Sequence, residues 1–540
     1  MKKSLTKSIK WLVIAALVAA FSFSIDGLLS IQMMRAIDAV TQMDRSAFVS
    51  QLVWMVILLL MLVPANLLLA FIRGMYKKSA VVHAKRYYVS RIFEKEIHKF
   101  QSENTATYLS ALTNDISNIE MNYIDGRYEV VYNFISFLIG IIVIAYVSPT
   151  ALGAGVLLGA VGVLISIIMG KPLARHQTQR SGFYKSYTSY IKEFLSAFHI
   201  IKANNLSQKV RDDFYSKSKD IQDKGYDIDV IISYISASQN FIMLFIMYGL
   251  LAFSVFLAIK GQLTLGGVVL IVNNMEKIMN PLMQISEWLP KIGSTKGVFA
   301  NMDALLVNDD ENFESVEIEK FEDSIQFEAV SFSYDAQQVF EEVNFSIVKG
   351  KKYLIVGPSG GGKSTLLKLL RKYFNPTSGI IKMDHNNIKH VTKETYFHQL
   401  ANIEQQVFIF EDTLRNNLCL YKDYSEDEIS LAIDRAGLTD FMMNHPDGLE
   451  RMLYDNGKNI SGGEKSRIAI ARGLLQKARI IVLDEAFSSL DATVAKEIEK
   501  TLLALDGVTV VNVSHVIFDE SKKKYDRIFM VKNKGVYALQ

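Results

Sequence analysis

Apolar runs long enough to cross a lipid bilayer recur through the first half of this 540-residue chain. A bilayer core requires roughly 20 apolar helical residues per span. Six segments meet or approach this length: Trp11 to Met34, Phe48 to Ile72, Val130 to Val147, Ala151 to Met169, Val230 to Ile259 and Leu265 to Leu289. The last one is interrupted by Glu276 and Lys277. The sequence therefore predicts an all-α transmembrane domain with six helices over residues 1–308.

Basic side chains gather in the long connections after the second and fourth candidate spans, Arg73 to Tyr128 and Lys171 to Asp227. The connections after the first, third and fifth spans are shorter and less basic. By the positive-inside rule, the two long loops and both termini face the cytoplasm. Helix-like spacing within the loops indicates that the membrane helices continue into the cytosol and turn at each tip. We expect a multi-pass protein of a bacterial cell membrane.

In the second half of the chain, a glycine-rich loop joins an apolar strand, Tyr353 to Val356, to the helical stretch Leu366 to Tyr373. Glycines let the backbone approach a polyphosphate closely, amides at a helix N-terminus bind it, and a lysine neutralises it. The full GxxxxGK[ST] spacing makes an ordinary turn a poor explanation. The sequence predicts a site for ATP or GTP. Its residues are Gly357, Pro358, Ser359, Gly360, Gly361, Gly362, Lys363, Ser364 and Thr365.

Two acids, Asp484 and Glu485, follow a second apolar strand. Open α/β sheets bind their ligands at the carboxyl ends of their strands. Asp484 and the Ser364 hydroxyl are suited to hold Mg²⁺, and Glu485 is placed to accept a proton from the water that attacks the γ-phosphate. A solvated strand end explains such a pair equally well when it stands alone, but the phosphate loop upstream favours the catalytic interpretation.

The segment Ile460 to Arg472 resembles the LSGGQ signature of ABC transporter ATPases, with Ile460 for the leucine and Glu464 for the glutamine. The core of the motif, Ser461, Gly462 and Gly463, is intact and is followed by a helix-period pattern. The resemblance implies that these residues and Glu464 present backbone amides to a γ-phosphate. It also implies an α/β P-loop ATPase domain over residues 324–540, joined to the membrane domain by an acidic linker, residues 309–323.

Other family elements follow by resemblance, each beside a simpler explanation. Gln405, which has a second glutamine after it, matches the residue that senses Mg²⁺ or water; a surface glutamine is the alternative. Tyr334 matches the aromatic that stacks on adenine, although strand aromatics are usually core. Asp491 matches the D-loop aspartate. His515 matches the catalytic switch histidine that contacts the γ-phosphate, where a local hydrogen bond is the alternative.

Each of these motifs occurs once, in the family's order. Family members sandwich each ATP between the phosphate loop of one ATPase domain and the signature of another. The resemblance therefore implies an exporter-type half-transporter that hydrolyses ATP with Mg²⁺ and works as a dimer, with itself or a similar chain. It also implies that the loop tips dock on the ATPase. Thr105 to Asp115 resembles the first tip, and Ile200 to Ala203 resembles the helix leading away from the second.

The cargo is left open by the sequence. Polar side chains in the fifth and sixth spans either bond to other helices, which we favour, or contact substrate. They are Gln239, Asn240, Asn273, Asn274, Glu276, Lys277 and Asn280. An exported peptide, lipid-like or drug-like amphipathic compound fits. An importer of a metal chelate or siderophore, and an ATP-gated regulatory protein, are the alternatives. A net charge of +3 does not suggest nucleic-acid binding, and the single cysteine, Cys419, excludes an internal disulfide and is expected to be buried.

Overall fold

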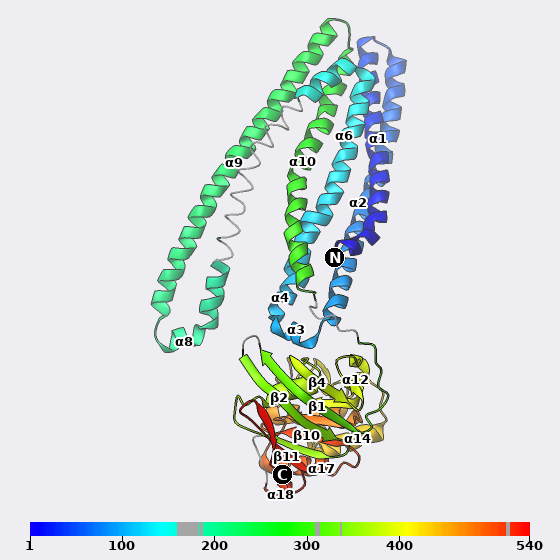
Figure 1. Ribbon diagram of the computed structural model, residues 1–540. Helices are drawn as coiled ribbons and strands as arrows, with labels where there is room; N and C mark the ends of the chain where they lie inside the picture. The colour runs from blue at the N-terminus through cyan, green and yellow to red at the C-terminus, as the bar shows by residue number, and fades with distance from the viewer. Residues whose placement is uncertain (159–182, 184–186, 308–313, 335–336, 515–518, 540) are drawn as a thin grey trace. The chain divides into compact units, whose positions relative to one another are not determined.

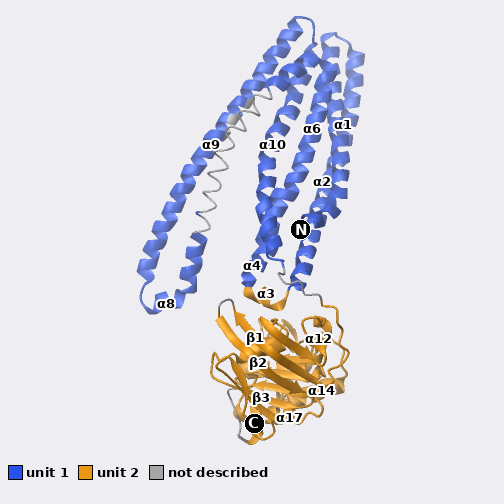
Figure 2. Ribbon diagram, in the orientation of Figure 1, with its two compact units in different colours: residues 1–95, 103–307 blue, residues 96–102, 308–540 orange. Residues whose placement is uncertain are grey.

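The computed structural model describes residues 1–158, 183, 187–307, 314–334, 337–514 and 519–539 (Figure 1). It divides into two compact units (Figure 2). Unit 1 contains Met1–Lys95 and Glu103–Val307, and unit 2 contains Glu96–Ser102 and Asn308–Gln540. Unit 1 is built of long helices, whereas unit 2 holds all the strands of the described chain together with short helices (Figure 1). The chain is thus a helical domain followed by an α/β domain.

Among its described residues, unit 1 is dominated by five long helices (Figure 1). They are α1 (Ile9–Thr41), α2 (Arg45–Phe93), α6 (Asp125–Val147), α9 (Ser207–Ile259) and α10 (Leu265–Ala304). Among the described residues, four helical stretches are long and apolar enough to cross a membrane: Lys2–Thr41, Arg45–Phe93, Thr105–Val147 and Ser207–Ile259. The predicted fourth span begins as the shorter apolar helix Pro149–Leu158 and then leaves the described residues. The predicted sixth span coincides with α10, which is not among these four stretches. The count of six spans therefore stays a prediction.

The first cytoplasmic tip lies earlier in the chain than the sequence indicated. After α2 ends at Phe93, the short helix α3 (Ile97–Ser102) follows, and the Asn104 side chain then accepts a hydrogen bond from the amide of Ala106. This cap starts α4 (Thr105–Ser110), which continues through the π-helical stretch Ala111–Asp115 toward α6. The prediction that Thr105 to Asp115 forms the tip was therefore wrong, because these residues belong to the returning helix.

The second tip also differs from its prediction. Ile200 to Ala203 lies within the short helix α8 (Phe198–Ala203). A turn at residues 204–206 separates α8 from α9, which is the helix that leads away. These four residues are consequently part of the tip itself.

Two contacts between α1 and α10 fix these helices against each other. At the start of α10, Asp38 of α1 accepts hydrogen bonds from the Gly266 amide and the Thr264 hydroxyl, both at 2.9 Å. A side chain at Gly266 would place its Cβ 2.2 Å from the Met34 carbonyl oxygen, so only glycine allows this approach. Asp38 thereby satisfies an amide that a helix N-terminus would otherwise leave unpaired.

Further along the same helix pair, the Lys277 ammonium lies 2.5 Å from the Asp26 carboxylate and donates to the Asn274 amide oxygen at 2.9 Å. Asn274 is fully buried. Three of the polar residues singled out in the sequence thus bond to protein groups, since the Asn273 amide also donates to the Met33 sulfur at 3.9 Å. The side chains of Asn240, Asn273, Glu276 and Asn280 are exposed in the single chain, and that of Gln239 lies outside the described residues.

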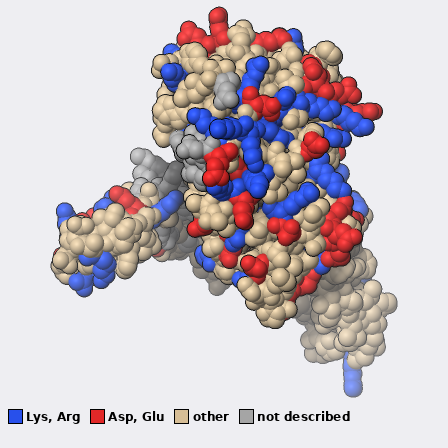
Figure 3. All heavy atoms as spheres, turned by 90° about the horizontal axis from the view of Figure 1, so that it is seen from below, with Lys and Arg blue, Asp and Glu red and all other residues tan. Residues whose placement is uncertain are grey.

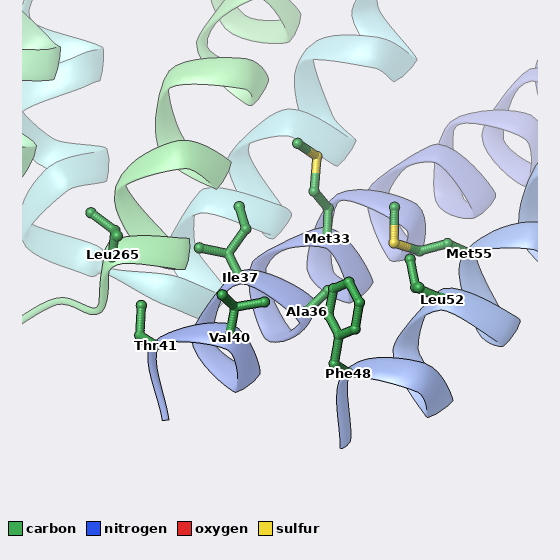
Figure 4. Close-up of a pocket in the computed structure, with 9 residues that line it drawn as sticks. All are labelled: Met33, Ala36, Ile37, Val40, Thr41, Phe48, Leu52, Met55 and Leu265. Carbon is green, nitrogen blue, oxygen red and sulfur yellow. The ribbon is translucent and has the colours of Figure 1, made fainter. Parts of the chain in front are cut away.

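An apolar pocket of about 330 Å³ lies where α1 turns into α2 (Figure 4). Its lining comes from α1, α2 and the first residue of α10: Met33, Ala36, Ile37, Val40, Thr41, Phe48, Leu52, Met55 and Leu265. No charged side chain is in this set, and the Thr41 hydroxyl is engaged with the Asp38 carbonyl oxygen. The pocket therefore has little with which to orient a polar ligand.

Unit 2 is organised around a six-stranded sheet in the order β12-β11-β3-β10-β9-β6. These strands are β12 (Gly535–Ala538), β11 (Arg527–Lys532), β3 (Lys352–Val356), β10 (Thr509–Val513), β9 (Ile480–Asp484) and β6 (Leu400–Ile403). All neighbouring pairs are parallel except β11 with β12. β3 and β10 are buried throughout, as is typical of parallel strands covered on both faces.

An antiparallel four-stranded sheet and a two-stranded sheet complete the strands described. The former has the order β2-β1-β4-β5, from β2 (Gln337–Val348), β1 (Ser324–Tyr334), β4 (Ser378–Met383) and β5 (Asn386–Asn387). The latter pairs β7 (Asp412–Thr413) with β8 (Met452–Leu453). One apolar core is shared by the antiparallel sheet and one face of the parallel sheet, and a second fills the helical side, where Cys419 is buried as expected.

Apart from α3, the described α-helices of unit 2 follow the phosphate loop and the later strands. They are α11 (Lys363–Leu370), α12 (Lys393–Gln399), α13 (Leu414–Cys419), α14 (Glu426–Arg435), α15 (Thr439–Met443), α16 (Gly462–Leu475), α17 (Ala492–Leu503) and α18 (Asp519–Lys522). Acidic and basic side chains are intermixed on the face seen in Figure 3.

Candidate nucleotide site

The glycine-rich loop connects β3 to α11 with a backbone that side chains would obstruct. A Cβ at Gly357 would lie 2.3 Å from the Val531 carbonyl oxygen. Gly362, which caps α11, has φ of +103°, a conformation that favours glycine. These two glycines let the loop turn tightly around the start of the helix, so that its amides and the first amides of α11 are available to an anion.

Lys363 is the first residue of α11 and is buried. Its ammonium donates to the carbonyl oxygens of Gly357 and Pro358, at 3.0 and 3.1 Å. The positive charge is thus held directly over the loop. Ser364, the predicted metal ligand, is exposed on the first turn of the helix, whereas Thr365 is buried.

Gln405 and Glu485 meet at the carboxyl ends of two neighbouring strands. β6 and β9 pair in parallel with Ile403 opposite Leu483, which places Gln405 opposite Glu485, two residues further on. The Gln405 amide donates to the Glu485 carboxylate at 2.8 Å. Glu485 has φ of +49°, and its own amide donates to the Val513 carbonyl oxygen at 2.9 Å. The chain therefore changes direction at Glu485 itself, the predicted catalytic residue, through its left-handed backbone conformation.

Asp484, the last residue of β9, lies half-buried beside a buried arginine. Burial raises the pKa of Asp484, and the charge of Arg371 opposes this shift. The Arg371 guanidinium donates to Asp484 at 3.4 Å and lies 4.0 Å from Glu404. Sequence reasoning missed Arg371, since arginine is rarely buried and nothing in the pattern marks this one.

The signature segment forms the N-terminus of α16. The Ser461 hydroxyl accepts from the Glu464 amide at 3.2 Å, and the Glu464 carboxylate accepts from the Ser461 amide at 2.6 Å. This reciprocal pair is a capping box. It gives Glu464 a structural use at the position where the family motif has glutamine, since the carboxylate satisfies a backbone donor at the helix end.

Ser489, two residues before the predicted D-loop residue Asp491, packs against this helix start. The Ser489 hydroxyl hydrogen-bonds to the Ser466 hydroxyl at 2.7 Å and lies 3.4 Å from the Gly462 carbonyl oxygen. Asp491 is the N-cap of α17 and accepts from the Thr493 amide. Its side chain therefore has a local structural partner. His515, the predicted switch histidine, lies outside the described residues.

Tyr334 belongs to a cluster of aromatic rings at the end of β1. Its ring lies 4.9 Å from Phe332 and 5.4 Å from Phe374, both nearly perpendicular to it. The Tyr334 hydroxyl is 3.4 Å from the Thr365 hydroxyl on α11. Tyr334, the predicted adenine contact, is therefore packed edge to face against two rings and hydrogen-bonded to the phosphate-loop helix.

A second arginine that the sequence did not mark, Arg472, joins α16 to the chain that follows Gln405. Its guanidinium donates to the Phe408 carbonyl oxygen at 2.7 Å and to the backbone and side-chain oxygens of Asn417 at 2.5 and 2.9 Å. Asn417 is fully buried, and its side chain hydrogen-bonds to both the amide and the carbonyl oxygen of Phe410. Burial lowers the pKa of Arg472 to about 10. The signature helix and the segment after Gln405 are thereby one hydrogen-bonded assembly.

The donor set fits a nucleotide with a hard divalent cation. Mg²⁺ is usually held by one or two protein oxygens together with substrate phosphates and water. Asp484 and Ser364 offer such oxygens beside the phosphate loop, and no group of three or more His, Cys, Asp or Glu able to cage a metal occurs among the described residues. Fold and site together define a P-loop ATPase domain linked to a helical membrane domain.

Comparison with known protein families agrees with this class. The family profile described as ABC transporter transmembrane region matches residues 12–282, and the profile described as ABC transporter matches residues 340–488. The chain belongs to the ABC transporter family. It is a multi-pass membrane protein with an ATP-binding ATPase domain, and it couples ATP hydrolysis to transport as an exporter-type member of that family.

Curated relatives cover most of the chain. It is 28% identical to the uncharacterized ABC transporter ATP-binding protein YfiC of Bacillus subtilis over 82% of this chain and 74% of that protein. A multidrug resistance ABC transporter ATP-binding and permease protein of Lactococcus lactis is 26% identical over 83% and 76%. An ATP-dependent lipid A-core flippase of Desulfotalea psychrophila is 34% identical over 51% and 48%. The solved structure of a bacterial Atm1-family ABC exporter with ATP bound has the same fold, with a TM-score of 0.82 at 21% identity, covering 99% and 95%.

Proposed function

We propose that this chain pairs with a second copy or a homologous partner, and that the two ATPase domains share two ATP sites with Mg²⁺. The convergence of the phosphate loop, Gln405, Asp484 and Glu485 at the carboxyl ends of β3, β6 and β9 carries this proposal. The chain holds one phosphate loop and one signature. The start of α16 at Ser461 and Gly462 is exposed, so its amides are open to a nucleotide held by the partner.

Within each site, the residues divide the work. Lys363 and the amides of Gly357 to Gly362 bind and neutralise the phosphates, and Ser364 and Asp484 hold Mg²⁺, which stabilises charge on the transferring phosphoryl group. Glu485 takes the proton of the attacking water. Gln405 orients the Glu485 carboxylate through the 2.8 Å hydrogen bond that joins the two side chains. Tyr334 stacks on the base. His515 contacts the γ-phosphate, and Asp491 shapes the loop facing the partner.

ATP binding drives transport by favouring the closed pair of ATPase domains. Shifting a two-state equilibrium from 1:99 to 99:1 requires about 5.5 kcal/mol of preferential binding. Ser461 and Gly462 of one chain supply such a preference, because they reach the nucleotide of the other chain only after closure. Hydrolysis then removes the bridging phosphate and allows the domains to separate.

For the cargo, we propose a peptide, lipid-like or drug-like amphipathic compound. Two relatives with known assignments are named for multidrug resistance and for lipid A-core flipping. On α10, the exposed side chains Asn273, Glu276 and Asn280 recur at helical spacing. Because polar side chains are costly in lipid, this face suits a water-accessible passage that accepts a polar head beside an apolar body.

Transport by reconstituted protein tests the proposal. In proteoliposomes with outward-facing ATPase domains, ATP should drive fluorescent lipids or cationic dyes into the lumen against a gradient, and Glu485→Gln should stop this accumulation. ATP-dependent movement that only equalises concentrations would instead identify a gated pathway. A detergent-solubilised protein that remains monomeric while hydrolysing ATP at full rate would overturn the shared-site dimer.

A further inference from the structure

The first cytoplasmic tip is packed into the ATPase unit by buried polar contacts. Glu96 is only 6% exposed, although it is acidic. Its carboxylate lies 3.3 Å from His98 Nδ1 and 4.0 Å from the Lys393 ammonium at the start of α12. Lys393 in turn lies 3.6 Å from Glu314, which also pairs with the buried Lys372. These ionic contacts fix the position of the tip on the ATPase unit. They join Glu96, His98, Lys393, Glu314 and Lys372.

His98 is the tip residue that meets the aromatic cluster. Its ring centroid lies 5.1 Å from that of Phe374, with the planes inclined by 35°. Phe374 contacts Tyr334 and Phe332, in each case at 5.4 Å and nearly edge to face. His98, Phe374 and Tyr334 therefore form a continuous line of ring contacts from the first tip to the predicted base-stacking residue.

The same cluster is attached to the phosphate-loop helix. The ammonium of Lys368 on α11 lies 5.7 Å from the centre of the Phe374 ring and 5.9 Å from that of Tyr334. Edge-to-face packing and cation–π contact both depend on ring orientation. Turning Tyr334 would disturb Phe374, and displacing His98 would remove the contact that supports Phe374 from the other side.

We propose that Phe374 and His98 are positioning residues for the adenine contact, so that docking of the first tip sets how well Tyr334 stacks on the base. The proposal rests on the proposed function in taking Tyr334 as the base-stacking residue. By linkage, a docked tip that strengthens ATP binding is itself held more firmly when ATP is bound, by the same factor. The first tip thereby affects binding of the adenine base separately from binding of the phosphates.

The test compares a ligand with a base to one without. Binding of ATP and of inorganic tripolyphosphate is measured on the full chain in nanodiscs, without divalent metal, by competition with radiolabelled ATP. His98→Ala should weaken ATP binding by about 5-fold or more, the lower range of allosteric couplings, and leave tripolyphosphate binding unchanged. His98→Phe, which keeps a ring, should restore ATP affinity. Phe374→Ala should act like His98→Ala, and Phe374→Tyr should preserve binding.

Tyr334→Ala separates this inference from the assignment beneath it. If that variant loses ATP affinity while His98→Ala does not, the base contact stands and the ring path is wrong. Equal weakening of ATP and tripolyphosphate in His98→Ala would also overturn the path, since it would show general damage to the site. If Tyr334→Ala binds ATP normally, Tyr334 is not the base contact and the inference fails with it.

Discussion

Gln405 donates its side-chain amide to Glu485 at 2.8 Å, and the two residues occupy matching positions beyond the paired strands β6 and β9. One oxygen of the Glu485 carboxylate is therefore already engaged. Arg472 joins the segment after Gln405 to the signature helix by hydrogen bonds to Phe408 and Asn417. The geometry links the proposed catalytic base to the surface that we propose the partner's nucleotide contacts.

Replacing the base should separate binding from turnover. Glu485→Gln keeps the shape of the side chain but cannot accept a proton, and general-base catalysis contributes about 10²- to 10⁴-fold in rate. We expect the rate of ATP hydrolysis, measured as phosphate release, to decrease by about 10²- to 10⁴-fold while ATP still binds. Gln405→Ala, which leaves the carboxylate in place, should lose less. Near-normal hydrolysis by Glu485→Gln would remove it as the base.

Arg472→Met should loosen the segment that follows Gln405. The change leaves the backbone oxygen of the fully buried Asn417 without its charged donor, and an unsatisfied buried polar group costs about 1–3 kcal/mol. We expect hydrogen exchange at residues 408–417 to accelerate more than in the rest of unit 2. Arg467→Met is the matched control, because Arg467 is on the same helix but bonds to Gly437 instead. Equal acceleration in both variants would show a general loss of stability.

The ion pair between Asp26 and Lys277 should stabilise unit 1. The pair is only partly buried, with the Lys277 side chain 17% and the Asp26 side chain 37% exposed, so we expect removal of one partner to cost less than the about 3–5 kcal/mol of a fully buried pair. All three tryptophans, Trp11, Trp54 and Trp288, lie in unit 1, so their fluorescence reports its thermal unfolding. Lys277→Met should lower the midpoint, and the exchanged pair Asp26→Lys with Lys277→Asp should recover part of it.

A second lysine of α10 provides the comparison. Lys291 pairs with Glu287 at 2.6 Å, but both side chains are exposed, and such pairs contribute less than about 1 kcal/mol. Lys291→Met should leave the unfolding midpoint almost unchanged. If both lysine variants unfold alike, the inner pair adds nothing beyond the lost side-chain packing.

Glu314 should give the ATPase unit an acid-sensitive contribution to stability. Burial pushes the pKa of Glu314 up, but hydrogen bonds from the Lys372 ammonium and the Lys393 amide outweigh it, so the pKa is lowered from 4.5. A carboxyl with a depressed pKa in the folded state stabilises above its unfolded pKa, and this stability is lost as the pH falls through the folded value. Glu314→Gln should therefore destabilise at pH 7 and show a flatter decline below pH 4.5.

Pulse proteolysis of unit 2 at a series of pH values measures this difference. Glu317→Gln, an exposed neighbour, serves as the control. A Glu314→Gln profile parallel to that of the unchanged protein at all pH values would contradict the assignment.

The sequence was most informative where function requires a fixed spacing. The loop from Gly357 to Thr365 must follow a strand and start a helix, and the structure has it so. Ser461 with Glu464 is a capping signal that can be read from spacing alone, although the resemblance to the motif did not assign Glu464 this role. Local chemistry decides such features, so they are visible without the fold.

Features that depend on distant partners were not predictable in the same way. Arg371 and Arg472 bond to residues far away in the chain, and nothing beside them in the sequence marks them as buried. The first tip was misplaced because no proline or glycine ends α2, although Asn104 was a usable sign that a helix begins at Thr105. Whether the exposed polar side chains of α10 face cargo depends on a partner chain, which a single sequence does not describe.

The two fastenings between α1 and α10 set a condition on how the membrane domain can open. Any motion that parts these helices uncovers the first amides of α10 at Asp38 and separates the Asp26 carboxylate from the Lys277 ammonium, which costs free energy within a membrane domain. The open arrangement is therefore unfavourable unless water or a polar cargo forms hydrogen bonds with the exposed groups. The contacts between α1 and α10 therefore oppose separation of the two helices. A cargo able to hydrogen-bond with these groups would make the separation easier.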